Sequence, residues 1–174
     1  METTKQDILK QRARLLAREN SRAQVVTDGL QTVRFTLLDE HYAIDAAHVC
    51  EVFPVKEITP LPCTPPYIKG IINVRGKILS VLDLRVFLKL PEKEASASNR
   101  IIILNNPELE IGVLVGRVIG LQTIPRNHIQ PDLPTLGDAR GHYLQGITGD
   151  RIALLDAEKL LSDPAIFIYE EVDG

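Results

Sequence analysis

The fold is decided by residues 65–85, which read PPYIKGIINVRGKILSVLDLR. Two β-rich runs, 70–74 and 77–83, flank Arg75-Gly76 and predict a β-hairpin. Gly76 can supply the positive φ of a type II turn or of a longer bulged loop, whereas Arg75 argues against a type I′ turn, which needs positive φ at both central positions. We expect the Arg75 side chain to lie in solvent, because burying an unpaired guanidinium is costly.

The composition is that of one compact domain or of two small fused ones. The chain has 174 residues, of which 44% are hydrophobic and 25% charged, enough for a buried core. The net charge of -3 provides no broad cationic surface for nonspecific nucleic-acid binding. No apolar run approaches the roughly 20 residues that span a bilayer, and the polar N-terminus lacks a signal-peptide apolar region. Cys50 and Cys63 make no disulfide framework and suit a reducing compartment. We therefore expect a cytoplasmic protein.

Residues 5–19 predict an amphipathic helix that begins with a capping box at Thr3–Gln6. One side carries, at helical spacing, Ile8, Leu9, Arg12, Leu15 and Leu16. Three interpretations are open: a helix that covers part of the domain, a docking helix for a partner, and a helix on a membrane surface. We favour the first because most such helices cover a core, and because the short apolar stripe lacks the aromatic anchors of a membrane helix.

Short strands separated by turn residues are predicted for most of the remaining chain. The alternation of Val33, Phe35 and Leu37 with polar residues indicates a half-buried strand. Further strands are predicted over 42–44, 49–54, 100–104, 110–115, 118–124, 143–147 and 152–155. The proline-rich residues 59–66 form an extended connector, because proline lacks the amide donor of a β-ladder. Residues 91–99 and 125–141 read as loops, and Asp45, Asp83 and Asp156 as caps of the segments that follow them. This pattern predicts a β-barrel or sandwich.

No catalytic or metal-binding constellation stands out. The four histidines, His41, His48, His128 and His142, are scattered and have no zinc-type spacing with either cysteine, so we interpret them as loop or surface residues. Neither cysteine has a neighbouring base that would mark a nucleophile. The recurring glycines Gly112, Gly116 and Gly120 indicate bulges or close backbone approaches rather than a phosphate cradle. We therefore expect no cofactor, no metal and no enzyme activity.

Glu51 and Arg75 are the candidate contact residues. Alternation along 49–54 predicts that Val49, Glu51 and Phe53 share one face, with a carboxylate between two apolar side chains. That composition is typical of a protein interface, and the alternative is an edge-strand charge that opposes aggregation. Arg75 is likewise either an interface residue or a solvated turn cation. The residues alone leave both alternatives open.

Several motifs occur in an informative order. They are YAI (42–44), VCEV (49–52), ITPLP (58–62), the hairpin of 65–85, RIIIL (100–104), EIGVLVGRVIGL (110–121), IQP (129–131) and RIALLDAEKLL (151–161). In this order they resemble the CheW family of bacterial and archaeal chemotaxis coupling proteins, over about residues 31–162. The resemblance implies a mainly β fold of two small five-stranded, SH3-like β-barrel subdomains that share a core. It also implies a scaffold without enzymatic activity.

The resemblance implies partners and site residues as well. Members of the family bind the cytoplasmic tips of methyl-accepting chemotaxis receptors and the regulatory domain of the histidine kinase CheA, in signalling arrays. By motif match the partner-binding residues are Val49, Glu51, Asn73, Arg75 and Gly76. The residues that match the structural signature of the family are Gly70, Asp83 and Arg85. Gly116 stands where the family often has aspartate, which leaves the kinase-side surface undefined.

We therefore expect an adaptor that couples receptors to CheA, located in the cytoplasm and associated with membrane receptor arrays through its partners. Residues 1–29 would be an N-terminal helix and linker, 30–163 the CheW-like domain and 164–174 an acidic tail. The alternative is a CheW-like scaffold in a non-flagellar chemosensory pathway, for pilus motility or gene regulation. A β-barrel that binds single-stranded nucleic acid is disfavoured by the 5% aromatic content and the negative net charge.

Overall fold

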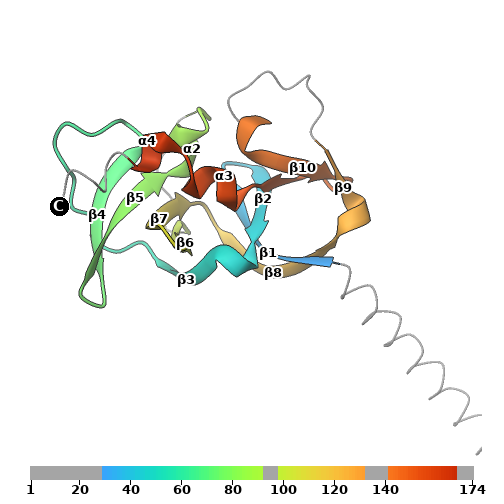
Figure 1. Cartoon of the computed structure of the whole chain (residues 1–174), viewed down its shortest axis with the longest axis horizontal. Helices are drawn as coiled ribbons and strands as arrows, with labels where there is room; N and C mark the ends of the chain where they lie inside the picture. The colour runs from blue at the N-terminus through green and yellow to red at the C-terminus, as the bar shows by residue number, and fades with distance from the viewer. Residues whose placement is uncertain (1–28, 92–97, 132–140, 168–174) are drawn as a thin grey trace, which may run out of the picture.

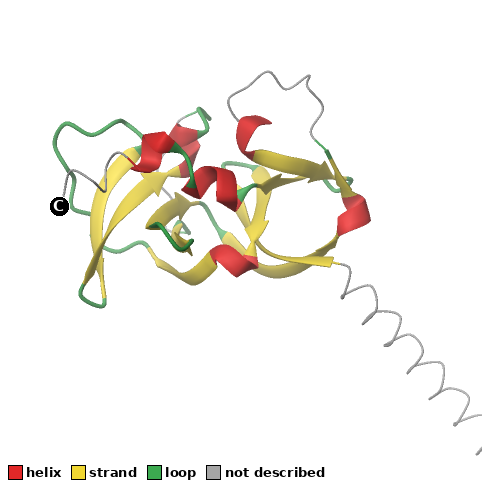
Figure 2. Cartoon of the chain, in the orientation of Figure 1, coloured by secondary structure: helices red, strands yellow, loops and turns green. Residues whose placement is uncertain are grey.

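A computed structural model describes residues 29–91, 98–131 and 141–167 of the chain. Strands dominate these residues, with a few short helices beside them (Figures 1 and 2). The predicted helix 5–19, most of the predicted loop 91–99 and the end of the acidic tail lie outside the described residues.

The first sheet has six strands in the order β8-β1-β2-β11-β10-β9. Their bounds are β1 (Gly29–Leu37), β2 (Glu40–Asp45), β8 (Val118–Pro125), β9 (Ile129–Gln130), β10 (Leu144–Thr148) and β11 (Ile152–Leu155). β2 and β11 pair in parallel, and the other neighbours are antiparallel.

The second sheet has five strands in the order β3-β6-β7-β5-β4. Their bounds are β3 (Val49–Pro54), β4 (Ile68–Val74), β5 (Lys77–Asp83), β6 (Arg100–Asn105) and β7 (Glu110–Val115). The short helices are η1 (Ala46–His48), α2 (Leu84–Phe87), η2 (Arg126–His128), η3 (Gly141–Tyr143), α3 (Ala157–Leu161) and α4 (Pro164–Phe167). Figure 1 shows the two sheets side by side, with α3 at their junction.

The mainly β prediction is confirmed, and the predicted strands recur as strands with small changes at their ends. The finer prediction of two five-stranded barrels is not confirmed. The first sheet contains six strands, and neither hydrogen-bonded order returns to its first strand. The loop predicted over 125–141 is more regular than expected, since η2 and β9 lie within it.

The main core fills the space between the two sheets. It includes Phe35 and Tyr42 from the first sheet, Leu82 and Leu104 from the second, and Leu160 from α3, all at most 2% exposed. A second cluster lies against the other face of the five-stranded sheet and contains Phe53, Ile72, Leu79, Val81, Ile101, Ile103 and Leu114. The strands of this sheet are therefore covered on both faces, which explains their long apolar runs.

The three predicted aspartate caps are confirmed. Asp45, Asp83 and Asp156 each accept a hydrogen bond from a backbone N–H two or three residues later, at 2.9, 3.0 and 3.2 Å. Such bonds satisfy amides that a helix leaves without an internal partner. Each short helix therefore starts immediately after a strand, which fixes the direction in which the chain leaves the sheet.

Two glycines of the 110–121 run have the predicted roles. Gly120 has a φ of 142° and lies where the β1–β8 register shifts. At Gly116 an added Cβ would lie 2.6 Å from the backbone oxygen of Thr36, whose oxygen accepts a hydrogen bond from the Gly116 N–H at 2.9 Å. An aspartate at position 116 would therefore require β1 and the β7–β8 turn to separate.

Candidate partner-binding site

The tip of the β4–β5 hairpin has a different turn from the one predicted. Val74 pairs directly with Lys77, so Arg75 and Gly76 form a two-residue loop. Their φ angles are 55° and 83°, and positive φ at both central residues is the mark of a type I′ turn. The exclusion of a type I′ turn on the basis of Arg75 was therefore wrong. A side-chain bond helps to hold the turn, because Asn73 Oδ1 accepts from the Gly76 N–H at 2.9 Å.

The hairpin tip is joined to β3 by an ion pair. Arg75 Nη2 donates to Glu51 Oε1 at 3.1 Å, and the two side chains are 82% and 36% exposed. β3 and β4 are the two edge strands of the five-stranded sheet, so the sheet curls until its edges approach each other. The connector after β3 also reaches β4, through an isolated bridge between Thr59 and Ile71. The fold thus brings together two candidate residues that were proposed separately.

Val49 lies on a different face from Glu51. The β3–β6 register shifts between these residues, so that Val49 is opposite Leu104 whereas Glu51 is opposite Ile103. Leu104 belongs to the main core and Ile103 to the second cluster, and paired residues point to the same face of a sheet. The prediction that Val49, Glu51 and Phe53 share one face was wrong at Val49, because a bulge at Cys50 reverses the alternation.

Further charges lie beside the Glu51–Arg75 pair. Lys77 Nζ donates to Glu110 Oε2, which links β5 to β7. Both side chains influence Cys50, which follows Val49 and is exposed. Partial burial raises the pKa of the Cys50 thiol, and the charge of Glu110 raises it further. At this edge the five-stranded sheet thus presents two acidic and two basic side chains around a mostly protonated thiol.

The signature residues Asp83 and Arg85 form a buried support behind the hairpin. The Asp83 side chain is 1% exposed, and its Oδ2 lies 3.2 Å from Arg85 Nη2 and 3.6 Å from Lys69 Nζ. Its backbone N–H donates to Tyr67 O at 2.7 Å. A buried carboxylate is tolerated here because cations and amides surround it. These contacts agree with the structural interpretation of this pair.

Gly70 is required where the proline-rich connector crosses β4. An added Cβ would lie 2.1 Å from the backbone oxygen of Thr59, and the φ of Gly70 is 146°. The Thr59–Ile71 bridge depends on this close approach, with both N–H···O distances at 2.9 Å. The glycine thus holds the connector against the hairpin that carries Arg75.

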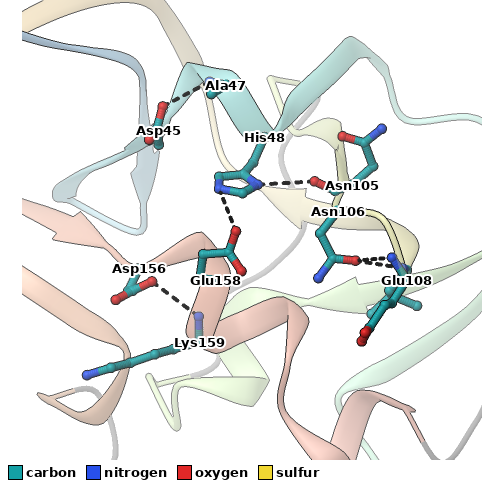
Figure 3. A network of polar contacts seen from close by, with 10 residues as sticks. Asp45, Ala47, His48, Asn105, Asn106, Glu108, Asp156, Glu158 and Lys159 are labelled. Atoms are coloured by element: carbon teal, nitrogen blue, oxygen red, sulfur yellow. Dashed lines mark hydrogen bonds and ion pairs between the residues drawn. The ribbon is translucent and has the colours of Figure 1, made fainter.

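His48 takes part in contacts that the sequence did not reveal. Its Nδ1 lies 3.2 Å from Asn105 O, at the end of β6, and its Nε2 lies 3.3 Å from Glu158 Oε1 on α3 (Figure 3). The His48 side chain is 18% exposed. It connects the start of β3 with the end of β6 and with α3. No local sequence motif predicts these contacts, because β3, β6 and α3 meet only in the tertiary fold.

Within the described residues, three or more metal-binding side chains do not gather at one place. None of the helices there is long and apolar enough to cross a membrane.

The sequence and fold are similar to those of known proteins. The family model described as a CheW-like domain matches residues 31–165. The chain belongs to the CheW family. Chemotaxis protein CheW of Klebsiella aerogenes is 31% identical over 149 residues, which cover 84% of this chain and 90% of that protein. Protein FrzA of Myxococcus xanthus is 34% identical over 132 residues, covering 73% and 82%.

The fold agrees with a solved CheW structure. The scaffolding protein TtCheW of Thermoanaerobacter tengcongensis superposes with a TM-score of 0.70 at 32% identity, covering 79% of this chain and 95% of TtCheW. A chemotaxis-family scaffold or adaptor with a CheW-like domain therefore describes this chain at the family level.

Proposed function

We propose that this protein is a non-enzymatic adaptor that couples methyl-accepting chemotaxis receptors to a CheA-type histidine kinase in signalling arrays. The observation that carries the proposal is the CheW-like domain over residues 31–165. The partners would be the cytoplasmic tip of the receptor and the regulatory domain of the kinase. The protein would act in the cytoplasm, held at membrane arrays by these partners. Residues 30–163 would form the coupling domain, with one subdomain built on each sheet.

The proposed contact surface consists of Glu51, Arg75 and the turn residues Asn73 and Gly76. Its support is the exposure of the ion pair and the stiffness of the turn that presents it. A preorganised side chain loses little conformational entropy when a partner binds. Val49 has a different role in this proposal: it packs against the main core and sets the position of β3.

An alternative is the same scaffold role in a non-flagellar chemosensory pathway. The similarity to FrzA, at 34% identity, favours keeping this alternative beside the first. The two differ in the receptors and kinase served, and the proposed site would be the same. Co-purification from the source organism distinguishes them, because the captured kinase and receptor identify the pathway.

The test of the adaptor function is reconstitution of receptor, CheA-type kinase and this protein. We expect kinase activity to come under receptor control only when all three are present. Arg75→Glu should abolish that control, whereas Arg126→Glu, at an exposed arginine beside the other sheet, should retain it. If the wild-type protein binds no CheA-type regulatory domain, the adaptor proposal fails. If Arg75→Glu couples normally, only the site assignment fails.

A further inference from the structure

A groove of about 580 Å³ opens at one end of the six-stranded sheet. It is lined by Asp39, Glu40, His41, Tyr42, Leu144, Ile147, Asp150, Arg151 and Ala153. Its floor is a cross-strand row: Ile147 is opposite Ala153, and Ala153 is opposite Tyr42. Ala153 and Tyr42 belong to or pack against the main core, so the groove is an apolar extension of that core toward solvent.

The rim of this groove is acidic. The carboxylates are those of Asp39 in the β1–β2 turn, Glu40 at the start of β2 and Asp150 in the β10–β11 turn. Arg151 supplies the one guanidinium among the lining residues. Three carboxylates against one guanidinium attract a basic occupant, and the floor requires that occupant to have an apolar face.

Two other exposed apolar side chains, both on β8, have the opposite charge environment. On the edge strand β8, Ile119 is 48% exposed and Leu121 is 79% exposed. The charged residues of the neighbouring backbone are Arg34, paired with Gly120, and Arg117, which precedes β8. A basic segment is therefore repelled from β8 and attracted to the acidic groove.

Residues 5–19, outside the described part of the chain, have the matching composition. They contain five basic and two acidic residues, and their predicted helix has an apolar stripe that ends in Leu15 and Leu16. The 12 residues between Leu16 and Gly29 can extend to roughly 40 Å. β1 leads from Gly29 to the β1–β2 turn over nine residues, or about 26 Å. The segment can thus reach the groove of its own chain.

We propose that the basic amphipathic segment 5–19 docks in this groove of the same molecule, with Leu15 and Leu16 over the row Tyr42–Ala153–Ile147 and with Arg12, on the same side of the predicted helix, toward the carboxylates of Asp39, Glu40 and Asp150. The segment then covers the exposed end of the core. The proposal does not depend on the adaptor function.

Paramagnetic relaxation enhancement tests the placement. Cys50 and Cys63 are exposed and are replaced by serine, and Ala17→Cys, on the polar side of the predicted helix, carries the nitroxide. We expect the strongest broadening at the amides of Tyr42, Ile147 and Ala153, and none at the hairpin tip. Broadening centred on β8 overturns the proposal. So does an absence of broadening at the groove, whether the groove is empty or is filled by residues 132–140. Broadening of ¹⁵N-labelled protein by a separate spin-labelled copy indicates a second molecule and also overturns it.

Charge reversal tests the recognition. In the labelled chain, Asp150→Lys should reduce the broadening several-fold, whereas Glu108→Lys, at an exposed carboxylate of the β6–β7 turn outside the groove, should leave it unchanged. Raising the salt concentration to about 1 M shortens the Debye length to about 3 Å and should weaken the broadening in the unsubstituted groove. Broadening that is insensitive to Asp150→Lys and to salt contradicts recognition by the acidic rim.

Discussion

Glu51 lies on β3, at one edge of the five-stranded sheet, and Arg75 lies in the turn after β4, at the other edge, yet their charged groups lie 3.1 Å apart. The pair links the start of the sheet to the tip of the hairpin that ends it. Since both side chains remain accessible, a partner that contacts this surface meets a carboxylate and a guanidinium already held in place. Substitutions in this pair can therefore test separately whether it contributes to partner binding and whether it contributes to the stability of the fold.

The first prediction concerns Arg75→Glu. The variant should keep the fold, because an exposed ion pair contributes about 0–1 kcal/mol to the unfolding free energy. It should lose receptor control of the kinase, because the charge that a partner meets at the turn is reversed. Urea denaturation measures the first effect, and reconstituted kinase activity measures the second. The double variant Glu51→Arg/Arg75→Glu restores an ion pair with exchanged ends. Recovery of control in it would show that the partner needs the intact pair rather than the arginine.

The second prediction separates Val49 from Glu51. Val49→Lys should lower the unfolding free energy by about 1–3 kcal/mol, because its side chain packs against the main core. Glu51→Lys should lower it by less than about 1 kcal/mol, since it removes an exposed pair. The urea midpoints of the two variants measure this difference. Equal midpoints would mean that Val49 lies on the exposed face after all.

The local features of the chain were predictable from its sequence. The hairpin at 65–85 and the three aspartate caps depend on residues adjacent in the chain, and the structure contains them. The turn type was not predictable, because left-handed φ at a non-glycine residue costs roughly 1–2 kcal/mol. At Arg75 the ion pair with Glu51 and the Asn73–Gly76 hydrogen bond can offset that cost.

The arrangement of the site was beyond sequence reasoning for two physical reasons. No glycine or proline marks the bulge at Cys50, which turns Val49 toward the main core. The curl that joins β3 to the hairpin tip depends on the whole sheet, and so does the contact of His48 with Asn105 and Glu158. Alternation and motif spacing describe one strand at a time. They therefore indicate neither the bulge at Cys50 nor the contacts that depend on the whole sheet.

The third prediction compares two glycines with different surroundings. Gly70→Ala should destabilise the protein severely, by more than about 3 kcal/mol, because its methyl group would meet Thr59 O at 2.1 Å at a φ of 146°. Gly76→Ala, at a φ of 83° with nothing within 4 Å of the added Cβ, should cost about 1–2 kcal/mol. Thermal unfolding of both variants measures the ranking. A Gly70→Ala protein as stable as the Gly76→Ala protein would contradict the close approach of the connector.

The fourth prediction concerns the buried carboxylate of Asp83. Asp83→Ala should lower the unfolding free energy by about 3–5 kcal/mol, because it leaves the Arg85 guanidinium, on a side chain only 14% exposed, without this partner and removes the cap of α2. Asp150→Ala, at an exposed turn position, is the matched control and should change stability by less than about 0.5 kcal/mol. The denaturant midpoints of the Asp83→Ala and Asp150→Ala variants measure this difference in stability. Similar values for both variants would show that Asp83 is not a structural support.

The last prediction is a pH dependence that arises from Tyr143. Burial, followed by the hydrogen bond that its hydroxyl donates to Asp163, raises the pKa of Tyr143 to about 12, against about 10 in an unfolded chain. The folded state therefore holds this proton more tightly, and the resulting stability is fully present below pH 10 and is lost as the pH rises toward 12. Over that range one such proton contributes a slope of at most about 1.4 kcal/mol per pH unit.

Tyr143→Phe removes this proton while keeping the ring that packs on Phe87, at 5.0 Å between centroids. Its unfolding free energy should be lower than that of the wild type at pH 9, and the difference should shrink by pH 12. Urea denaturation in steps across this range measures the difference, and comparison of the two proteins cancels the titration of lysines and other tyrosines. A difference that stays constant from pH 9 to pH 12 would mean that the Tyr143 hydroxyl is not held by Asp163 in the folded protein.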